Sequence, residues 1–293
     1  MKYKMVLIDI DGTLVDKNGR IAEEDKQAIT RLTYESVVVA LCTGRVVQDT
    51  ISVINELGLN TFNVFYDGAF IANAYTKCKL FSQPVDVALV RELVDFCRQN
   101  NIYLELYANG FSSHPDNHQI SANWSPTTHK DFLFSERPNW SDAIHRDFFQ
   151  VVPTIVNFDD IIGREEILKA GISVNSDDEA MQAKQLRDYF GDRFRYSIAH
   201  SPAFHEVDFI NLLHPQVSKG TALKELIDYW GYPASEIVAI GDGLNDIPLM
   251  EMVKVSVAMG NACDELKRVS NYVTDTIEEH GVAKAINFFF FPE

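Results

Sequence analysis

Basic side chains are scarce in this 293-residue chain. Its 26 lysines and arginines stand against 42 aspartates and glutamates, which gives a formal charge of −16. Proteins that bind nucleic acid need a basic face for the phosphate backbone, so we expect no nucleic-acid partner. Small anionic substrates stay open, because a metal ion and a few well-placed cations can reverse the local field.

Cysteine is equally sparse, with four residues and no C-x-x-C pair, so neither a zinc site nor a redox motif is indicated. The wide spacing argues against a disulfide framework and fits the reduced thiols of the cytoplasm. The four are Cys42, Cys78, Cys97 and Cys263.

Long apolar runs are absent, and none approaches the length of a membrane span, so we expect no membrane association. The first apolar stretch, Met5 to Ile8, runs directly into Asp9 and Asp11, which is not the pattern of a signal peptide. We therefore expect a cytoplasmic protein. Nothing in the sequence indicates its oligomeric state.

Apolar runs alternate with helical patterns at both ends of the chain. Continuous apolar runs separated by helices indicate strands buried on both faces, hence a parallel sheet. The sequence predicts an α/β fold with a Rossmann-like, doubly wound core. The expected strands are 4–10, 37–42, 63–66, 236–240, 255–258 and 271–274, and the expected helices are 22–34, 46–57, 218–230, 245–252, 262–269 and one from 278.

The middle of the chain has a different, α+β pattern. A hairpin is expected over 69–81, and Pro84 and Pro215 are plausible hinge points. We expect residues 84–212 to be inserted into a core made of 1–83 and 213–293. Within the insert, the expected helices are 86–100, 159–169 and 178–190, and the expected strands are 102–107, 148–156, 194–199 and 204–210.

Two aspartates follow the first predicted strand, in the motif Asp9-Ile10-Asp11-Gly12-Thr13-Leu14. Open α/β sheets bind ligands at the carboxyl ends of their strands, and carboxylates at i and i+2 of an extended segment point the same way. One could hold a hard cation and attack phosphorus while the other works as a general acid and base. The alternative is an Asp-Gly turn that only ends a strand.

Two further sites carry weaker signals. Thr43 and Gly44 end the second predicted strand, where a hydroxyl and backbone amides suit a phosphate oxygen, although an ordinary helix cap would look the same. Lys219 begins a helix, where a cation is unfavourable. It could pair with a phosphate or with Asp9, or be a solvated surface lysine.

A second acidic pair lies in Gly241-Asp242-Gly243-Leu244-Asn245-Asp246, again between a strand and a helix. Asp242 would bind a metal, and Asp246 could reach the ion through water or hold the lysine. Carboxylates, a carbonyl and waters are the ligands of Mg²⁺. The alternative is an acidic cap at the start of a helix.

Together the four motifs, in this order, resemble the haloacid dehalogenase superfamily and, within it, the Cof-type sugar phosphatases. The resemblance covers the whole chain and implies a magnesium-dependent phosphatase. It also implies that residues 84–212 form a cap that selects a small phosphorylated metabolite, most often a sugar phosphate.

The resemblance also assigns roles to single residues. It makes Asp9 the nucleophile that forms an aspartyl-phosphate and Asp11 the general acid and base. Mg²⁺ would be held by Asp9, the Asp11 carbonyl and Asp242, with Asp246 behind them. The phosphate would be bound by Thr43, Gly44, Lys219 and Asn245.

The chain departs from the family pattern at two positions, because Val46 stands where proline is frequent and Asp67 where asparagine is usual. The resemblance makes polar and aromatic side chains of the cap candidates for substrate contact, although a structural or surface role is favoured for each: Tyr107, Asn109, His114, His118, Trp124 and His129.

Two rival functions remain open. A phosphomutase could use the same superfamily architecture, and a protein that binds sugar phosphates without turning them over could retain the fold. The intact Asp9, Asp11, Lys219 and Asp242 disfavour the second rival.

Overall fold

The computed structural model describes residues 2–109, 132–147, 151–201 and 204–292. Its centre is a five-stranded parallel sheet in the order β14-β13-β12-β1-β2. The strands are β1 (Met5–Ile8), β2 (Val38–Leu41), β12 (Ile237–Gly241), β13 (Val255–Ala258) and β14 (Tyr272–Val273). All residues of β1 and β12 are buried, as expected for strands covered on both faces.

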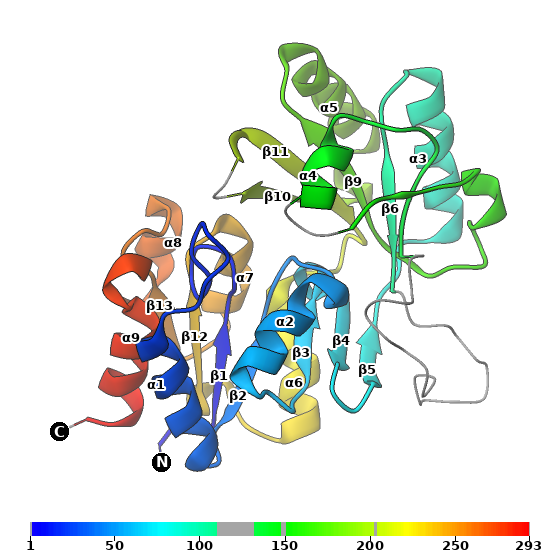
Figure 1. Ribbon diagram of the computed structural model, residues 1–293. Helices are drawn as coiled ribbons and strands as arrows, with labels where there is room; N and C mark the ends of the chain where they lie inside the picture. The colour runs from blue at the N-terminus through cyan, green and yellow to red at the C-terminus, as the bar shows by residue number, and fades with distance from the viewer. Residues whose placement is uncertain (1, 110–131, 148–150, 202–203, 293) are drawn as a thin grey trace.

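Helices cover both faces of this sheet (Figure 1). On one face α1 contacts α2 and α9, and on the other α7 contacts α6 and α8. The predicted doubly wound α/β core is therefore confirmed. The helices are α1 (Glu23–Tyr34), α2 (Val47–Leu57), α6 (Lys219–Trp230), α7 (Ile247–Met250), α8 (Asp264–Val269) and α9 (Gly281–Phe290).

A small antiparallel sheet in the order β3-β4-β5 follows α2. Cys42 forms a parallel bridge with Val64, which places β3 beside the end of β2. The predicted hairpin is present as β4 and β5. The three strands are β3 (Asn63–Phe65), β4 (Phe70–Asn73) and β5 (Cys78–Ser82).

The middle of the chain forms a six-stranded, mostly antiparallel sheet in the order β10-β11-β9-β6-β7-β8. Its strands are β6 (Glu105–Ala108), β7 (Leu133–Ser135), β8 (Thr154–Ile155), β9 (Ile167–Val174), β10 (Arg195–Ser201) and β11 (Phe204–Leu213). Helices α3 (Val87–Gln99) and α5 (Asp177–Phe190) lie on the side away from the core, and α4 (Ser141–Asp147) is shorter.

The two faces of this second sheet differ in chemistry. Leu106, Ala170 and Leu212 are register partners and belong to a buried apolar cluster that includes residues of α3 and α5. Tyr107 and Lys169 are register partners one residue away, so their side chains lie on the opposite face. That opposite face is turned toward the core.

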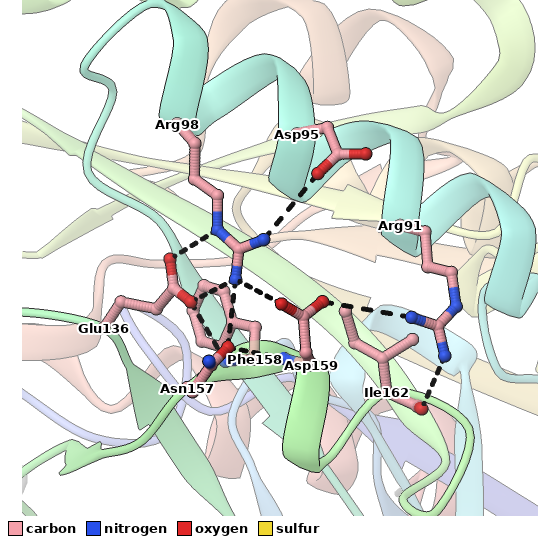
Figure 2. Close-up of polar contacts among 8 residues, drawn as sticks. All are labelled: Arg91, Asp95, Arg98, Glu136, Asn157, Phe158, Asp159 and Ile162. Atoms are coloured by element: carbon pink, nitrogen blue, oxygen red, sulfur yellow. Dashed lines mark hydrogen bonds and ion pairs between the residues drawn. The ribbon is translucent and has the colours of Figure 1, made fainter.

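Arg98 joins α3 to the loops beside β7 and β8 (Figure 2). Its guanidinium donates to Glu136 Oε2 at 3.0 Å, Asn157 Oδ1 at 3.1 Å and Asp159 Oδ2 at 3.2 Å. Arg91, two turns earlier, donates to the Ile162 carbonyl at 3.2 Å. This network fixes segment 157–162 against α3.

The predicted helix over 159–169 is wrong. A 3₁₀ turn spans Phe158–Asp160, and the chain then becomes β9, whose eight residues are all buried. A short apolar run does not show whether its residues repeat with the period of a helix or of a strand. Here the segment forms a strand because it pairs with β11 on one side and β6 on the other.

Smaller differences concern element ends and short elements. The predicted strand over 148–156 is limited to β8, with 148–150 outside the described residues, and β7 and α4 were not expected. The helix over 245–252 is divided into a 3₁₀ turn at Leu244–Asp246 and α7. No helix in the described ranges is both long and apolar enough to span a bilayer.

Candidate active site

The acidic motifs meet at the carboxyl edge of the parallel sheet. Asp9 directly follows β1, and its amide donates to the Ile240 carbonyl of β12 at 2.9 Å. Asp242 directly follows β12. The neighbouring positions of β1 and β12 thus bring together carboxylates that are more than 200 residues apart in the chain.

Lys219 joins two of these carboxylates. It is fully buried at the first position of α6, and its Nζ lies 2.5 Å from Asp9 Oδ1 and 2.6 Å from Asp246 Oδ1. Ser218 caps the helix by accepting from the Thr221 amide at 3.0 Å, which fixes the start of α6. Of the two partners considered from sequence, the structure gives Lys219 the carboxylate.

Asp246 and Asp242 are held in place by further hydrogen bonds. Asp246 Oδ2 accepts from the amides of Asp242 at 3.1 Å and Gly243 at 3.0 Å. Asp242 Oδ1 accepts from Thr13 Oγ1 at 2.8 Å. Gly12 has φ +78, and a Cβ there would lie 2.3 Å from Asp242 Oδ2, so glycine is required by both backbone and space.

The buried carboxylates repel one another. Burial raises the pKa of Asp9 well above its usual value, and Asp246 and Asp242 add to this while Lys219 opposes it. Burial, followed by the charge of Asp246, raises the pKa of Asp242 to about 7. Burial alone would lower the pKa of Lys219, but Asp246 and Asp9 outweigh it and raise that pKa.

The donor set fits a divalent cation. One carboxylate oxygen from each of Asp9, Asp242 and Asp246 lies within 4.8 Å of the others. Among the described residues, Lys219 is the cation paired with this cluster, and its single positive charge does not balance three carboxylates. Oxygen ligands of this kind suit Mg²⁺, and Asp9 and Asp242 retain more capacity for it than Asp246, whose two oxygens already accept hydrogen bonds.

Asp11 is held apart from this cluster by Arg45. Arg45 Nε donates to Asp11 Oδ2 at 2.8 Å, and Nη2 lies 2.5 Å from Oδ1. Arg45 Nη1 also donates to the Asp49 carbonyl at 3.4 Å. Arg45 is not among the site residues predicted from the sequence, and the structure pairs it with the predicted general acid.

The Thr43–Gly44 loop lies beside the same carboxylates. Thr43 is buried, and its Oγ1 accepts from the Arg45 amide at 3.1 Å. A Cβ on Gly44 would lie 2.9 Å from Asp67 Oδ1, so Asp67 lies directly behind this loop.

Asp67 and Asn245 are joined to each other. The Asn245 amide nitrogen donates to Asp67 Oδ1 at 2.9 Å. Asp67 is buried with φ +53, and its Oδ2 has no hydrogen-bond partner among the described residues. The departure from asparagine at position 67 therefore places a carboxylate under Asn245, one of the predicted phosphate ligands.

A cavity of about 450 Å³ opens between these loops and the second sheet. It is lined by most of the predicted site residues: Asp9, Asp11, Thr43, Gly44, Asp242 and Asn245. Lys219 and Asp246 lie behind them, fully buried. The opposite wall includes Tyr107, Phe132, His145, Lys169, Phe209 and Asn211.

Of the cap candidates, Tyr107 reaches the cavity, while Asn109 donates to Glu166 Oε2 at 2.8 Å instead. His114, His118, Trp124 and His129 lie outside the described residues. No sequence signal points to His145, Lys169 or Asn211, because none of them lies in a motif and only the placement of the second sheet brings them to the cavity.

Comparison with known proteins connects this arrangement to one family. The haloacid dehalogenase-like hydrolase family matches residues 6–286. A 5-amino-6-(5-phospho-D-ribitylamino)uracil phosphatase of Bacillus subtilis is 29% identical over 294 residues, covering 97% of each chain. A putative phosphatase of the same organism is 26% identical over 290 residues, again covering 97% of each.

Solved structures show the same fold. A haloacid dehalogenase-like hydrolase from Bacteroides thetaiotaomicron aligns with a TM-score of 0.79 and 22% identity, covering 98% of this chain and 100% of the other.

Proposed function

The chain belongs to the haloacid dehalogenase-like hydrolases, and from that premise we propose that it is a phosphatase for small phosphate monoesters, most of all sugar phosphates. Its full-length relatives are named as phosphatases. One of those names places the phosphate on a ribityl chain, a sugar alcohol. Both points support hydrolysis of a phosphorylated, hydroxyl-rich metabolite.

The Asp9 carboxylate is the observation that carries the proposal. Lys219 holds its Oδ1, while Oδ2 makes no hydrogen bond with another described residue and Asp9 lines the cavity. We assign Asp9 as the nucleophile. Its oxygen attacks phosphorus, the bond from phosphorus to the ester oxygen breaks, and an aspartyl-phosphate forms.

Asp11 is assigned the proton transfers. It gives a proton to the departing ester oxygen and later takes one from the water that attacks the aspartyl-phosphate, which returns Asp9 and releases phosphate. Arg45 orients the Asp11 carboxylate through two hydrogen bonds. For these steps the Asp11 carboxyl, two residues from the nucleophile, would leave Arg45 and turn to the ester oxygen or the water.

Phosphate binding is assigned to Thr43, the Gly44 amide, Lys219 and Asn245. Three of these residues line the cavity, and Lys219 supplies positive charge from behind Asp9. Phosphoryl transfer depends mainly on positioning and charge neutralisation, which fixed donors of this kind provide.

Magnesium is assigned to Asp9, the Asp11 carbonyl and Asp242, with Asp246 behind them. When bound, the ion would offset the repulsion between the anionic phosphate and the carboxylate nucleophile. Support comes from the acidic cluster and from the raised pKa values of Asp9 and Asp242, both of which a divalent cation would lower.

We further propose that residues 84–212 form a cap over a core of 1–83 and 213–293. Two apolar clusters support this division, since one gathers around the parallel sheet and the other lies between the second sheet, α3 and α5. The first cluster also takes in Tyr107, Phe132, Leu133 and Leu168, which are the points where the two parts pack together. Closing a cap over the site would exclude water and select the leaving group.

Measuring phosphate release from a panel of sugar phosphates tests the function. Wild-type enzyme with magnesium should release phosphate, and both a chelator and Asp9→Asn should reduce kcat by at least about 1,000-fold, because the substitution removes the attacking carboxylate. Adding magnesium back should restore only the chelated wild type.

Two results would contradict the proposal. Full activity of the Asp9→Asn variant with a wild-type melting temperature would refute the nucleophile assignment. Isomerised sugar without free phosphate would show a phosphomutase instead.

A further inference from the structure

Lys169 is a buried cation in the middle of the cap sheet. It lies on β9, beside its register partners Tyr107 on β6 and Leu213 on β11, and it is only 6% exposed. Its side chain lies on the face turned to the core and lines the cavity. Central sheet positions of this kind are ordinarily apolar, so a lysine here requires an explanation.

The contacts of Lys169 leave most of its hydrogen-bonding capacity unused. Nζ donates to the Gly44 carbonyl at 3.4 Å and lies 4.4 Å from the centre of the Tyr107 ring. No carboxylate among the described residues comes within ion-pair distance of it. Since an ammonium carries three donors and a buried charge is costly without partners, Lys169 can donate further hydrogen bonds to a group bound in the cavity.

Asn211, on the neighbouring strand β11, is a second buried polar side chain with unused hydrogen-bonding capacity. It lines the cavity from β11 and is 5% exposed. Its side-chain amide makes no hydrogen bond with the described part of the chain. Glu105 and Asn211 are both register partners of Gly171, on opposite sides of it. Glu105 does not bind Asn211, because it accepts from Tyr107 Oη at 2.7 Å and contacts His145 Nε2 at 3.1 Å.

The surrounding charge indicates which kind of acceptor suits Lys169. Burial lowers the pKa of Lys169, while Asp67, Asp49 and Glu105 act in the opposite sense through their negative charge. Asp49 also lines the cavity. A second phosphate would add negative charge beside these acidic groups, whereas neutral hydroxyl oxygens can accept from Lys169 and Asn211 without adding any.

We propose that Lys169 and Asn211 form a leaving-group subsite that binds hydroxyl oxygens, so the enzyme selects monophosphates of polyhydroxylated alcohols over alkyl phosphates and bisphosphates. The inference rests on the proposed phosphatase function. Phe132 and Phe209 line the same cavity and offer apolar surface to the carbon chain of such a substrate. Through the Gly44 carbonyl, Lys169 also connects this subsite to the loop assigned to phosphate binding.

Paired substrates test the subsite without any substitution. The kcat/KM values of wild-type enzyme are compared for pentitol and hexitol monophosphates and for n-alkyl phosphates with the same number of carbons. We expect at least a tenfold preference for the best hydroxylated member, and a bisphosphate of the same skeleton should be a poorer substrate than the monophosphate.

Lys169→Met tests the residue itself, since methionine has a similar length and no donor. The preference for the hydroxylated substrate should fall by about tenfold, as loss of one charge-assisted hydrogen bond does, mainly through KM. Asn211→Leu should act in the same direction, and Lys169→Gln, which keeps an N–H donor, should restore part of the preference. Lys184→Met is the matched control, because Lys184 lies exposed on α5 and pairs with Asp188 at 3.3 Å.

The outcomes separate the two proposals. Equal kcat/KM for hydroxylated and alkyl phosphates in the wild type would overturn the subsite even if the variants failed to fold. A Lys169→Met variant that loses activity equally on both substrates would overturn the role of Lys169. Absence of phosphate release by the wild type from every ester would refute the phosphatase function instead.

Discussion

Single residues of the site were foreseen to different degrees. Asp9 and Asp242 lie at or next to the carboxyl ends of predicted strands, so the parallel-sheet pattern placed both at one edge of the sheet. For Lys219, pairing with Asp9 was one of the alternatives left open, and the structure shows that hydrogen bond. Lys169 carries no such signal. It lies within a segment predicted as helix, and its role depends on which face of β9 looks toward the core.

Asp25 is a buried carboxyl far from the cavity, in α1. Its Oδ1 accepts from the Ala283 amide in the first turn of α9 at 2.7 Å, while Oδ2 has no partner among the described residues. Burial raises the pKa of Asp25 to about 6. The folded protein therefore holds this proton at pH values where the unfolded chain has released it.

From this we predict that Asp25 makes the protein less stable as the pH rises from about 4 to about 6, because the folded state binds more protons than the unfolded state in that window. In Asp25→Asn, which keeps an acceptor for Ala283, that loss should be absent. The free energy of unfolding of the variant relative to wild type should improve by roughly 2 kcal/mol between pH 4 and pH 7.

Urea unfolding of both proteins across this pH range measures the difference. Asp228→Asn, at an exposed position of α6, is the control and should show a nearly constant difference. A constant difference for Asp25→Asn as well would mean that Asp25 is ionised in the folded protein throughout.

At the scale of elements, α6 links stability to the site. Its capping box at Ser218 and Thr221 is encoded locally and was readable from the sequence as a helix start. The helix ends at Gly231 with φ +71, which is equally local. By contrast, β9 was mispredicted because its strand character comes from pairing with β6 and β11, which are distant in sequence.

Ser218→Ala should reduce the free energy of unfolding by about 1 kcal/mol, the usual cost of losing an N-cap. It should also lower kcat by roughly tenfold, because Lys219 follows directly and a small displacement of a catalytic group is costly. Ser176→Ala removes the corresponding N-cap of α5, which lies within residues 84–212, and provides the comparison.

Thermal unfolding and steady-state kinetics on both variants distinguish the two effects. We expect similar losses of stability but a loss of kcat in Ser218→Ala alone. If kcat is unchanged in Ser218→Ala, the start of α6 does not position Lys219 for catalysis.

At the scale of the whole molecule, the cavity belongs to neither sheet alone. The core contributes carboxylates and the Thr43–Gly44 loop, and the second sheet contributes Lys169, Asn211 and aromatic side chains. The sequence predicted the core half because its residues form contiguous motifs. The residues from the second sheet could not be predicted in this way. They reach the cavity only through the placement of that sheet across the core, and no local sequence pattern determines this placement.

The proposed function assigns chemistry to the core and substrate selection to residues 84–212, with Asp9 as the proposed nucleophile. Quenching the wild-type enzyme with acid during turnover, reducing it with borohydride and mapping its peptides by mass spectrometry tests that assignment directly. An aspartyl-phosphate at Asp9 would be reduced to homoserine, so homoserine at position 9 is the predicted result, dependent on substrate and absent from Asp9→Asn. Reduction at another carboxylate, or an unmodified Asp9 while substrate is being consumed, would contradict the account.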